Sequence, residues 1–135
     1  MKLNDIIWTD KMRAVMKDEA RILFLTGATG CSKTLVAGHK FMDWLLNAPA
    51  DDTQFYMIFK DRGTGVRNIL QNKDSFYNMY DFMREPYVSG KDGGLQFIFH
   101  GLYGDKYVYL LGADDRSAWS KILGANPNGL WLEEL

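Results

Sequence analysis

A glycine-rich loop between an apolar strand and an amphipathic helix is the feature that most constrains how this chain can fold. The loop consists of Gly27, Ala28, Thr29, Gly30, Cys31, Ser32, Lys33 and Thr34. It follows the phosphate-binding pattern G-x-x-x-x-G-K-[ST], or Walker A motif, with a serine in place of the second glycine. Residues 21–26 before it form a continuous apolar run, and a helical pattern follows it to about residue 47. A strand–loop–helix unit of this kind predicts an α/β fold.

Each position of the loop has a chemical reason. Gly27 and Gly30 allow the backbone to curl so that its N–H groups face phosphate oxygens, and the helix that follows adds the positive end of its dipole. We expect all eight residues to bind the phosphates of ATP, with Lys33 reaching the β- and γ-phosphates as a catalytic residue and Thr34 joining the shell of Mg²⁺. Cys31 is interpreted as a small filler. The alternative is a glycine turn with an incidental lysine.

An acidic pair near the end of the sequence could complete the site, in the manner of a Walker B motif. A P-loop ATPase needs one acid to hold Mg²⁺ and a carboxylate to orient the attacking water. Residues 130–132 form a short apolar strand that leads into Glu133 and Glu134. By position, Glu133 would hold Mg²⁺ through water, and Glu134 would be the catalytic residue that polarises the water. The alternatives are two solvated carboxylates, or a pair at Asp114 and Asp115 after another apolar strand.

Composition limits the function classes less sharply. The chain has 135 residues, 47% of them hydrophobic, which is typical of one folded domain. Its 16 basic and 17 acidic residues give no support for DNA binding, which usually shows a basic excess. No apolar run approaches the length of a membrane span, and the single cysteine fits a reducing cytoplasm.

Periodicity predicts the other elements. Helices are expected at residues 9–17, 32–47, 66–71, 75–83 and 117–123. Strands are expected at residues 21–26, 55–59, 95–99, 107–111 and 130–132, with 95–99 and 107–111 joined as a hairpin by residues 101–105. Residues 86–94 and 124–129 are expected to be loops, and the glycines at 63 and 65 to break the chain before the helix at 66–71. The two histidines and four tryptophans are interpreted as structural residues.

With both motifs identified, the chain resembles the N-terminal ATPase region of bacteriophage terminase large subunits, especially the PBSX-like group. The likeness covers nearly the whole chain and is sharpest in Cys31-Ser32-Lys33-Thr34 and in the acidic pair. It also includes the segments 55–60, 67–70, 95–99, 112–115 and 121–124. The fold that the resemblance implies is a P-loop NTPase three-layer sandwich of the additional-strand, catalytic-glutamate type.

The activity that the resemblance implies is hydrolysis of ATP with Mg²⁺, coupled to translocation of double-stranded viral DNA into a procapsid. The implied partners are the portal protein and a small terminase subunit, with the motor acting as a homo-oligomeric ring in the cytoplasm of the bacterial host. Two other classes remain open from the residues alone. One is an unrelated P-loop ATPase, helicase-like or protein-remodelling, and the other is a nucleotide-binding module without turnover.

The sequence departs from the family pattern in three places. Ala28 and Thr29 lie where terminases often place an arginine, the segment at residues 9–12 has no adenine-reading glutamine, and Glu133 replaces the usual aspartate. The longer side chain of Glu133 must retract to leave room for water. Arg116 or Lys121 could reach the nucleotide of a neighbouring subunit, although solvated helix charges are the plainer interpretation.

The resemblance also predicts what would extend the fold. In the family, the strand after the acidic pair inserts between that strand and the P-loop strand. We therefore expect residues 1–135 to be a partial ATPase domain, truncated after the Walker B strand, with the rest of that domain and a C-terminal nuclease domain beyond Leu135. The isolated 135 residues are expected to be marginally stable and to turn over little ATP.

Overall fold

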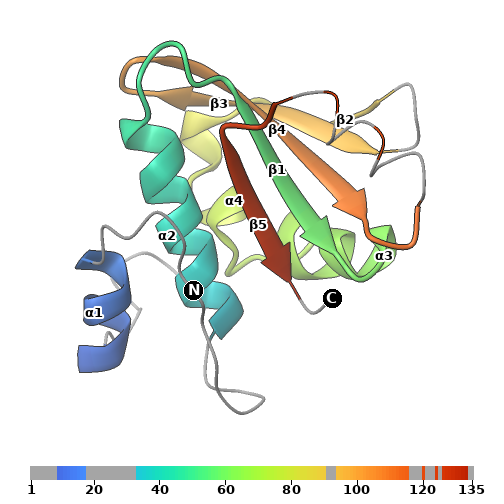
Figure 1. Ribbon diagram of the computed structural model, residues 1–135. Coiled ribbons are helices and arrows are strands. Elements are labelled where there is room, and N and C mark those ends of the chain that lie inside the picture. Colours follow the sequence, from blue (N-terminus) through green and yellow to red (C-terminus); the bar gives the residue numbers. More distant parts are fainter. Residues whose placement is uncertain are drawn as a thin grey trace.

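The computed structural model has a mixed β-sheet with helices packed against it (Figure 1). It describes residues 9–17, 33–90, 94–115, 120, 124 and 126–133. In this part of the chain the strands are β1 (Gln54–Phe59), β2 (Val88–Ser89), β3 (Leu95–Gly101), β4 (Gly104–Gly112) and β5 (Gly129–Glu133). Their spatial order is β2-β3-β4-β1-β5. The α/β class predicted from the sequence is therefore confirmed.

Strand direction decides where the chemistry can gather. β1 pairs in parallel with both β4 and β5, whereas β3 is antiparallel to β4 and β2 is antiparallel to β3. The carboxyl ends of β1, β4 and β5 therefore lie at one edge of the sheet. In Figure 1 the arrowhead of β5 lies beside the beginning of the long helix α2 (Lys33–Asn47). This edge is where open α/β sheets place their ligands.

The helices largely follow the predicted pattern. The described helical segments are α1 (Asp10–Lys17), α2, α3 (Arg62–Gly65), the π-helical η2 (Val66–Leu70), α4 (Phe76–Met79) and the 3₁₀ turn η3 (Asp81–Met83). α2 buries Phe41 and Leu45 at helical spacing, as expected for an amphipathic helix, and Ala48 directly after it is buried as well. α1 is joined to α2 by the Lys40 ammonium group, which donates a hydrogen bond to the Met16 carbonyl at 3.0 Å.

Three predictions about local structure were wrong. The two glycines after β1 lie inside a helix, because Asp61 caps its first turn and Gly65 packs where a Cβ would lie 2.8 Å from Phe59. The helix expected at 75–83 is interrupted at Tyr80, whose backbone leaves the helical region. The loop expected at 86–94 contains β2, which pairs with the edge of β3.

The predicted hairpin is confirmed, with a tighter turn than expected. β3 and β4 remain paired as far as Gly101 and Gly104, so the turn is reduced to Leu102 and Tyr103. Gly104 has a φ of 135°, a conformation that favours glycine. Leu102 and Tyr103 are exposed at the tip. Residues 21–26, predicted to be a strand, lie outside the described residues. Of the predicted helix at 117–123, only residue 120 is described.

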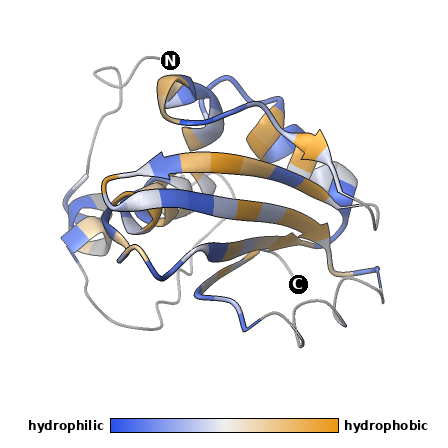
Figure 2. Cartoon of the chain, turned by 90° about the horizontal axis from the view of Figure 1, so that it is seen from above, coloured by the Kyte–Doolittle hydropathy of each residue, from blue (hydrophilic) through white to orange (hydrophobic). Residues whose placement is uncertain are grey.

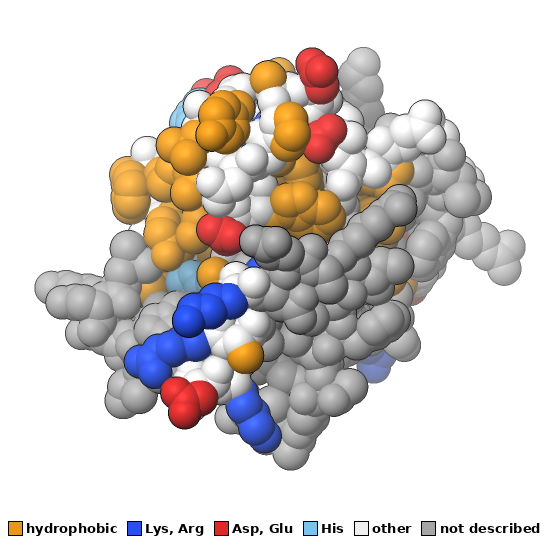
Figure 3. Space-filling view, turned by 60° about the vertical axis from the view of Figure 1, so that its left-hand side comes forward, with side chains coloured by type: hydrophobic (Ala, Val, Ile, Leu, Met, Phe, Trp, Pro, Cys, Tyr) orange, Lys and Arg blue, Asp and Glu red, His pale blue; other side chains and the backbone are white. Residues whose placement is uncertain are grey.

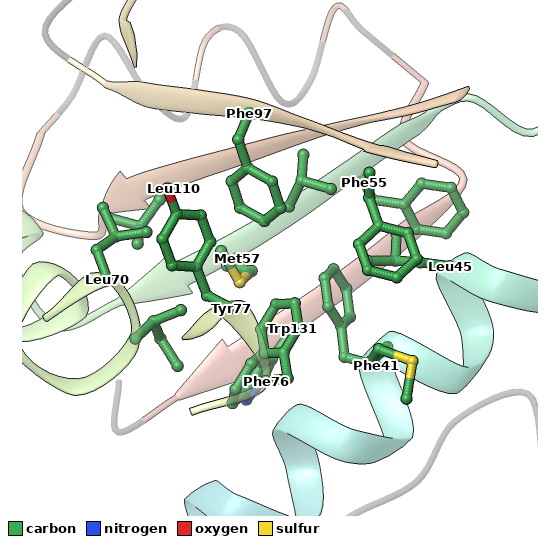
Figure 4. Packing of buried hydrophobic residues seen from close by; sticks show 14 of the residues in the cluster. Phe41, Leu45, Phe55, Met57, Leu70, Phe76, Tyr77, Phe97, Leu110 and Trp131 are labelled. Carbon is green, nitrogen blue, oxygen red and sulfur yellow. The ribbon is translucent and has the colours of Figure 1, made fainter. Parts of the chain in front are cut away.

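The main core is an aromatic layer between the sheet and the helices α2, η2 and α4. Figure 4 shows Phe41, Phe55, Phe76, Phe97 and Trp131 converging from helices and strands. Successive residues of a strand point to opposite faces of the sheet, so each apolar run contributes buried side chains to both faces. Burying each of these rings stabilises the fold by roughly 1.5–3 kcal/mol.

The opposite face of the sheet has a smaller apolar cluster. Tyr56, Ile58 and Leu111 are buried there, and the ring of Tyr56 stacks on that of Tyr109 with 4.8 Å between centroids. Leu130 and Leu132 of β5 point to this side and are 42% and 52% exposed. The hydropathy colouring of Figure 2 shows the hydrophobic segments of the strands. The two faces are thus covered unequally by the described residues.

Candidate functional site

One residue from each sequence motif lies at the carboxyl edge of the sheet. Thr34 lies in the first turn of α2, and Glu133 is the last described residue of β5. The Thr34 hydroxyl donates a hydrogen bond to Glu133 Oε1 at 2.8 Å, although 99 residues separate the two in sequence. The structure thus brings Thr34 and Glu133 together. Their roles toward phosphate and Mg²⁺ stay predictions.

The second oxygen of the same carboxylate is also held. The indole Nε1–H of Trp131 donates to Glu133 Oε2 at 2.9 Å. Trp131 and Glu133 are two residues apart on β5, so their side chains share a face of the sheet. From the sequence, Trp131 was expected to be a core or interface residue. The i, i+2 spacing on a strand was the available signal for this second role.

Packing explains why β5 lies against α2. The ring of Trp131 lies 5.6 Å from that of Phe41 on α2 and 6.2 Å from that of Phe76 on α4. Gly38 of α2 faces the same rings, since a Cβ there would lie 3.3 Å from the Phe76 ring, a tight contact, and at an ordinary 3.5 Å from the indole ring. This hydrophobic contact brings the first turn of α2 to the end of β5. The polar pair at the edge is therefore positioned by the aromatic core beneath it.

Several predicted site residues lie outside the described structure. These are Gly27, Ala28, Thr29, Gly30, Cys31, Ser32, Glu134, Arg116 and Lys121. Lys33 is described only as the first residue of α2, so the helix includes the last two residues of the predicted motif. Their roles remain predictions.

The fallback acidic pair follows a strand that is not adjacent to β5. Asp114 and Asp115 follow β4, which is separated from β5 by β1. Adjacent strands are about 4.8 Å apart, so this places the pair roughly 10 Å across the sheet from Glu133. The Asp115 amide donates to the Gly112 carbonyl at 3.2 Å in a turn. The geometry favours Glu133 as the acid beside Thr34.

Asp61 is a further acid at the same edge, and it has a local role. Its carboxylate accepts hydrogen bonds from the Thr64 amide at 2.7 Å and from the Thr64 hydroxyl at 3.0 Å. The backbone hydrogen bond, followed by the hydroxyl and by the charges of Arg67 and Lys60, lowers the pKa of Asp61. Asp61 therefore remains ionised as the N-cap of α3.

The oxygen donors at this edge fit a hard divalent cation. A hydroxyl and a carboxylate are ligands that suit Mg²⁺, which usually keeps several waters and takes its other ligands from phosphates. The described residues contain no group of three or more His, Cys, Asp and Glu side chains that could hold a metal by themselves. Thr34 and Glu133 together offer one hydroxyl and one carboxylate of this kind.

Basic side chains do not dominate the described surface. On the face shown in Figure 3, hydrophobic side chains gather in the upper part, and Lys and Arg lie in the lower part beside undescribed residues. No continuous basic surface crosses the described part of that face. Likewise, none of the helices in the described ranges is long and apolar enough to cross a membrane.

Comparisons with known proteins agree with this fold. No family model matches the sequence, and no curated protein matches it significantly. Two solved structures are similar, both of the large terminase from one thermophilic bacteriophage, in different crystal forms. The fold is terminase-like.

The extent of that similarity is clear from the superpositions. One crystal form gives a TM-score of 0.64 at 20% identity, covering 96% of this chain and 32% of the terminase chain. The other gives 0.59 at 16% identity, covering 94% and 37%. The chain thus spans about a third of the length of the structures it matches. At this level of identity the comparison shows a shared fold.

Proposed function

We propose that this chain is the nucleotide-binding part of an ATPase motor of the terminase large subunit type, in the PBSX-like group. The observation that carries the proposal is the 2.8 Å hydrogen bond between Thr34 and Glu133. It joins the end of a phosphate-binding motif to the acid of a Walker B strand in a terminase-like fold. An incidental glycine turn gives no reason for this pairing.

The chain's own residues divide the work of the site. The amides of residues 27–34 and the Lys33 ammonium group bind the phosphates of ATP. Thr34 and Glu133 hold Mg²⁺, the latter through water, and the bound Mg²⁺ supplies charge neutralisation at the phosphates. Glu134 orients and polarises the attacking water and accepts its proton. Arg116 or Lys121 is the candidate basic group for the nucleotide of a neighbouring subunit.

The partners belong to the same proposal. A motor of this type works as a homo-oligomeric ring at the portal of a procapsid in the bacterial cytoplasm. It moves double-stranded viral DNA and receives it with the help of a small terminase subunit. The support for these partners is the terminase-like fold together with the residues of the two motifs.

The experiment that tests the proposal is nucleotide binding by the Lys33→Ala variant. A lysine–phosphate contact is a charge-assisted hydrogen bond worth about 1.5–3 kcal/mol, so binding of Mg²⁺ with a non-hydrolysable ATP analogue should weaken at least about tenfold. Lys60→Ala, which removes an exposed lysine at the end of β1, is the matched control and should bind normally. Equal affinity of Lys33→Ala and the unmodified protein would contradict the proposal.

Steady-state ATP hydrolysis with and without double-stranded DNA separates the function classes. Stimulation by DNA supports a packaging motor. Turnover that ignores DNA supports a protein-remodelling ATPase, and binding without turnover supports a nucleotide-binding module.

A further inference from the structure

Both oxygens of the Glu133 carboxylate have defined hydrogen-bond donors. Thr34 donates to Oε1 at 2.8 Å and Trp131 donates to Oε2 at 2.9 Å. The indole has a single N–H group, and here it is directed at a carboxylate instead of a backbone carbonyl. Hydrogen bonds to an ionised acceptor are about twice as strong as neutral ones.

The donor is itself fixed by the core. Trp131 is 7% exposed, and its ring packs against Phe41, Phe59 and Phe76 with centroid separations of 5.6, 5.7 and 6.2 Å. These contacts come from α2, β1 and α4. Figure 4 shows the indole of Trp131 enclosed between these elements. A ring held on three sides has little freedom to move its N–H group.

The length of the Glu133 side chain explains why the hydrogen bond from Trp131 matters. A glutamate has one more rotatable bond than an aspartate, so its carboxylate samples more positions unless something restrains it. Here Thr34 on α2 restrains one oxygen and Trp131 on β5 the other. Both oxygens of the longer side chain are therefore held in place by neighbours.

We propose that Trp131 is a positioning residue that sets the carboxylate of Glu133 for the metal of a bound Mg²⁺–nucleotide. The inference rests on the proposed function of this site and adds a residue to it. Loss of an outer-shell hydrogen bond to a metal ligand typically weakens metal binding about 10- to 100-fold. The aromatic core and the metal site are linked through one N–H group.

The first test needs neither nucleotide nor metal. In the ¹H–¹⁵N NMR spectrum of the protein, Trp131→Phe identifies the indole cross-peak of Trp131 among those of the four tryptophans. Glu133→Gln removes the negative charge of the acceptor, so that cross-peak should move upfield by more than the cross-peak of Trp44. A Trp131 cross-peak that stays in place in Glu133→Gln would overturn the proposal.

The second test measures the Mg²⁺ concentration at which a non-hydrolysable ATP analogue binds half-maximally. Trp131→Phe keeps an aromatic ring and removes the N–H group, and we expect the required Mg²⁺ concentration to rise about tenfold. Trp44→Phe is the matched control, because Trp44 packs on the same Phe41 and has no contact with Glu133 among the described hydrogen bonds. Identical Mg²⁺ dependence in Trp131→Phe and the unmodified protein would overturn the inference.

A double-mutant cycle separates positioning from packing. Glu133→Asp shortens the side chain, so its carboxylate cannot keep both donors. The further change Trp131→Phe should then raise the required Mg²⁺ concentration less than about twofold, whereas independent effects would multiply and contradict the inference. Absence of nucleotide binding by the unmodified protein would refute the proposed function, while the NMR test would still decide the role of Trp131.

Discussion

The two ends of α2 have polar contacts of opposite kinds. At its first turn, the half-buried Thr34 hydroxyl donates to the Glu133 carboxylate at the edge of the sheet. Beyond its last turn, the Lys106 ammonium group is fully buried and donates to the carbonyls of Pro49 at 2.6 Å and Asp52 at 2.8 Å. Both arrangements suit the helix dipole, with an anion near the amino end and a cation near the carboxyl end.

The difference lies in access to solvent and ligands. The Lys106 side chain is enclosed, and its ammonium group has these carbonyls in place of water, so this contact serves stability. Thr34 and Glu133 are open enough for their oxygens to meet a ligand, so this contact can be exchanged. We expect changes at the carboxyl end of α2 to alter unfolding and changes at the amino end to alter binding and turnover.

The largest expected effect concerns turnover. Glu134→Gln should lower ATP turnover by about 10²- to 10⁴-fold, because it removes the proposed general base. Binding of a non-hydrolysable ATP analogue and the thermal unfolding midpoint should stay unchanged. Steady-state kinetics and calorimetry measure both. Normal turnover in this variant would remove Glu134 from the chemistry, and the fallback Asp114→Asn should then be tested in the same assay.

At the other end, Lys106→Met should destabilise the protein by about 1–3 kcal/mol. The aliphatic stem is kept, but two carbonyls lose their donor. The shift of the denaturant midpoint measures this cost, and Lys60→Met, at an exposed lysine, serves as its control. Nucleotide affinity should not change. A Lys106→Met protein with unchanged stability and impaired nucleotide binding would contradict the assignment of this contact to stability.

Thr34→Val sharpens the comparison with a nearly isosteric change. Losing the hydroxyl should raise the Mg²⁺ concentration needed for nucleotide binding about tenfold, with little change in the free energy of unfolding. Thr64→Val is matched to it, because that threonine donates its hydroxyl to Asp61 away from the predicted metal position. If both variants shift the Mg²⁺ dependence equally, the effect is not specific to Thr34.

The smallest expected effect comes from the middle of α2. His39 is 1% exposed and packs edge-on against Tyr80, and burial lowers its pKa below 6.5. Since the unfolded chain then binds the proton more readily, stability should fall as pH drops below about 6.5, by at most about 1.4 kcal/mol per pH unit. Denaturant unfolding between about pH 7 and pH 5 measures this slope.

A variant makes the pH prediction specific. His39→Phe should flatten the slope, whereas His100→Gln, a change at an exposed residue that bonds Asp105, should keep the acid-induced loss. An unchanged slope in His39→Phe would assign the loss to other groups.

The sequence predicted the elements well where periodicity is local. The spacing of Phe41 and Leu45 on α2 and the apolar runs of β1 and β4 were sufficient for helix and strand assignment. It failed where a tertiary contact overrides propensity. The helix through Gly65 depends on close packing against Phe59 and Leu110, and β2 forms because the edge of β3 offers hydrogen-bond partners.

The candidate site divides in the same way. The phosphate-binding pattern at residues 27–34 and the acidic pair after an apolar strand could be recognised from the sequence, because each pattern consists of residues close together in the chain. Strand order decides that Glu133, and not Asp114, is the acid beside Thr34. It places β5 beside α2, whereas β4 is two strands away from β5. The hydrogen bond of Trp131 likewise required the fold, since a tryptophan in an apolar strand usually signals only burial.

By itself, then, the sequence determined most of the described helices and strands and which residues are candidates for binding a triphosphate. The tertiary structure decided which of those residues meet, how Glu133 is held, and where Lys106 finds its acceptors. The physical reason is range. Backbone propensity and hydrophobic periodicity act over a few residues, whereas a contact across 99 residues exists only after the aromatic core has brought β5 against α2.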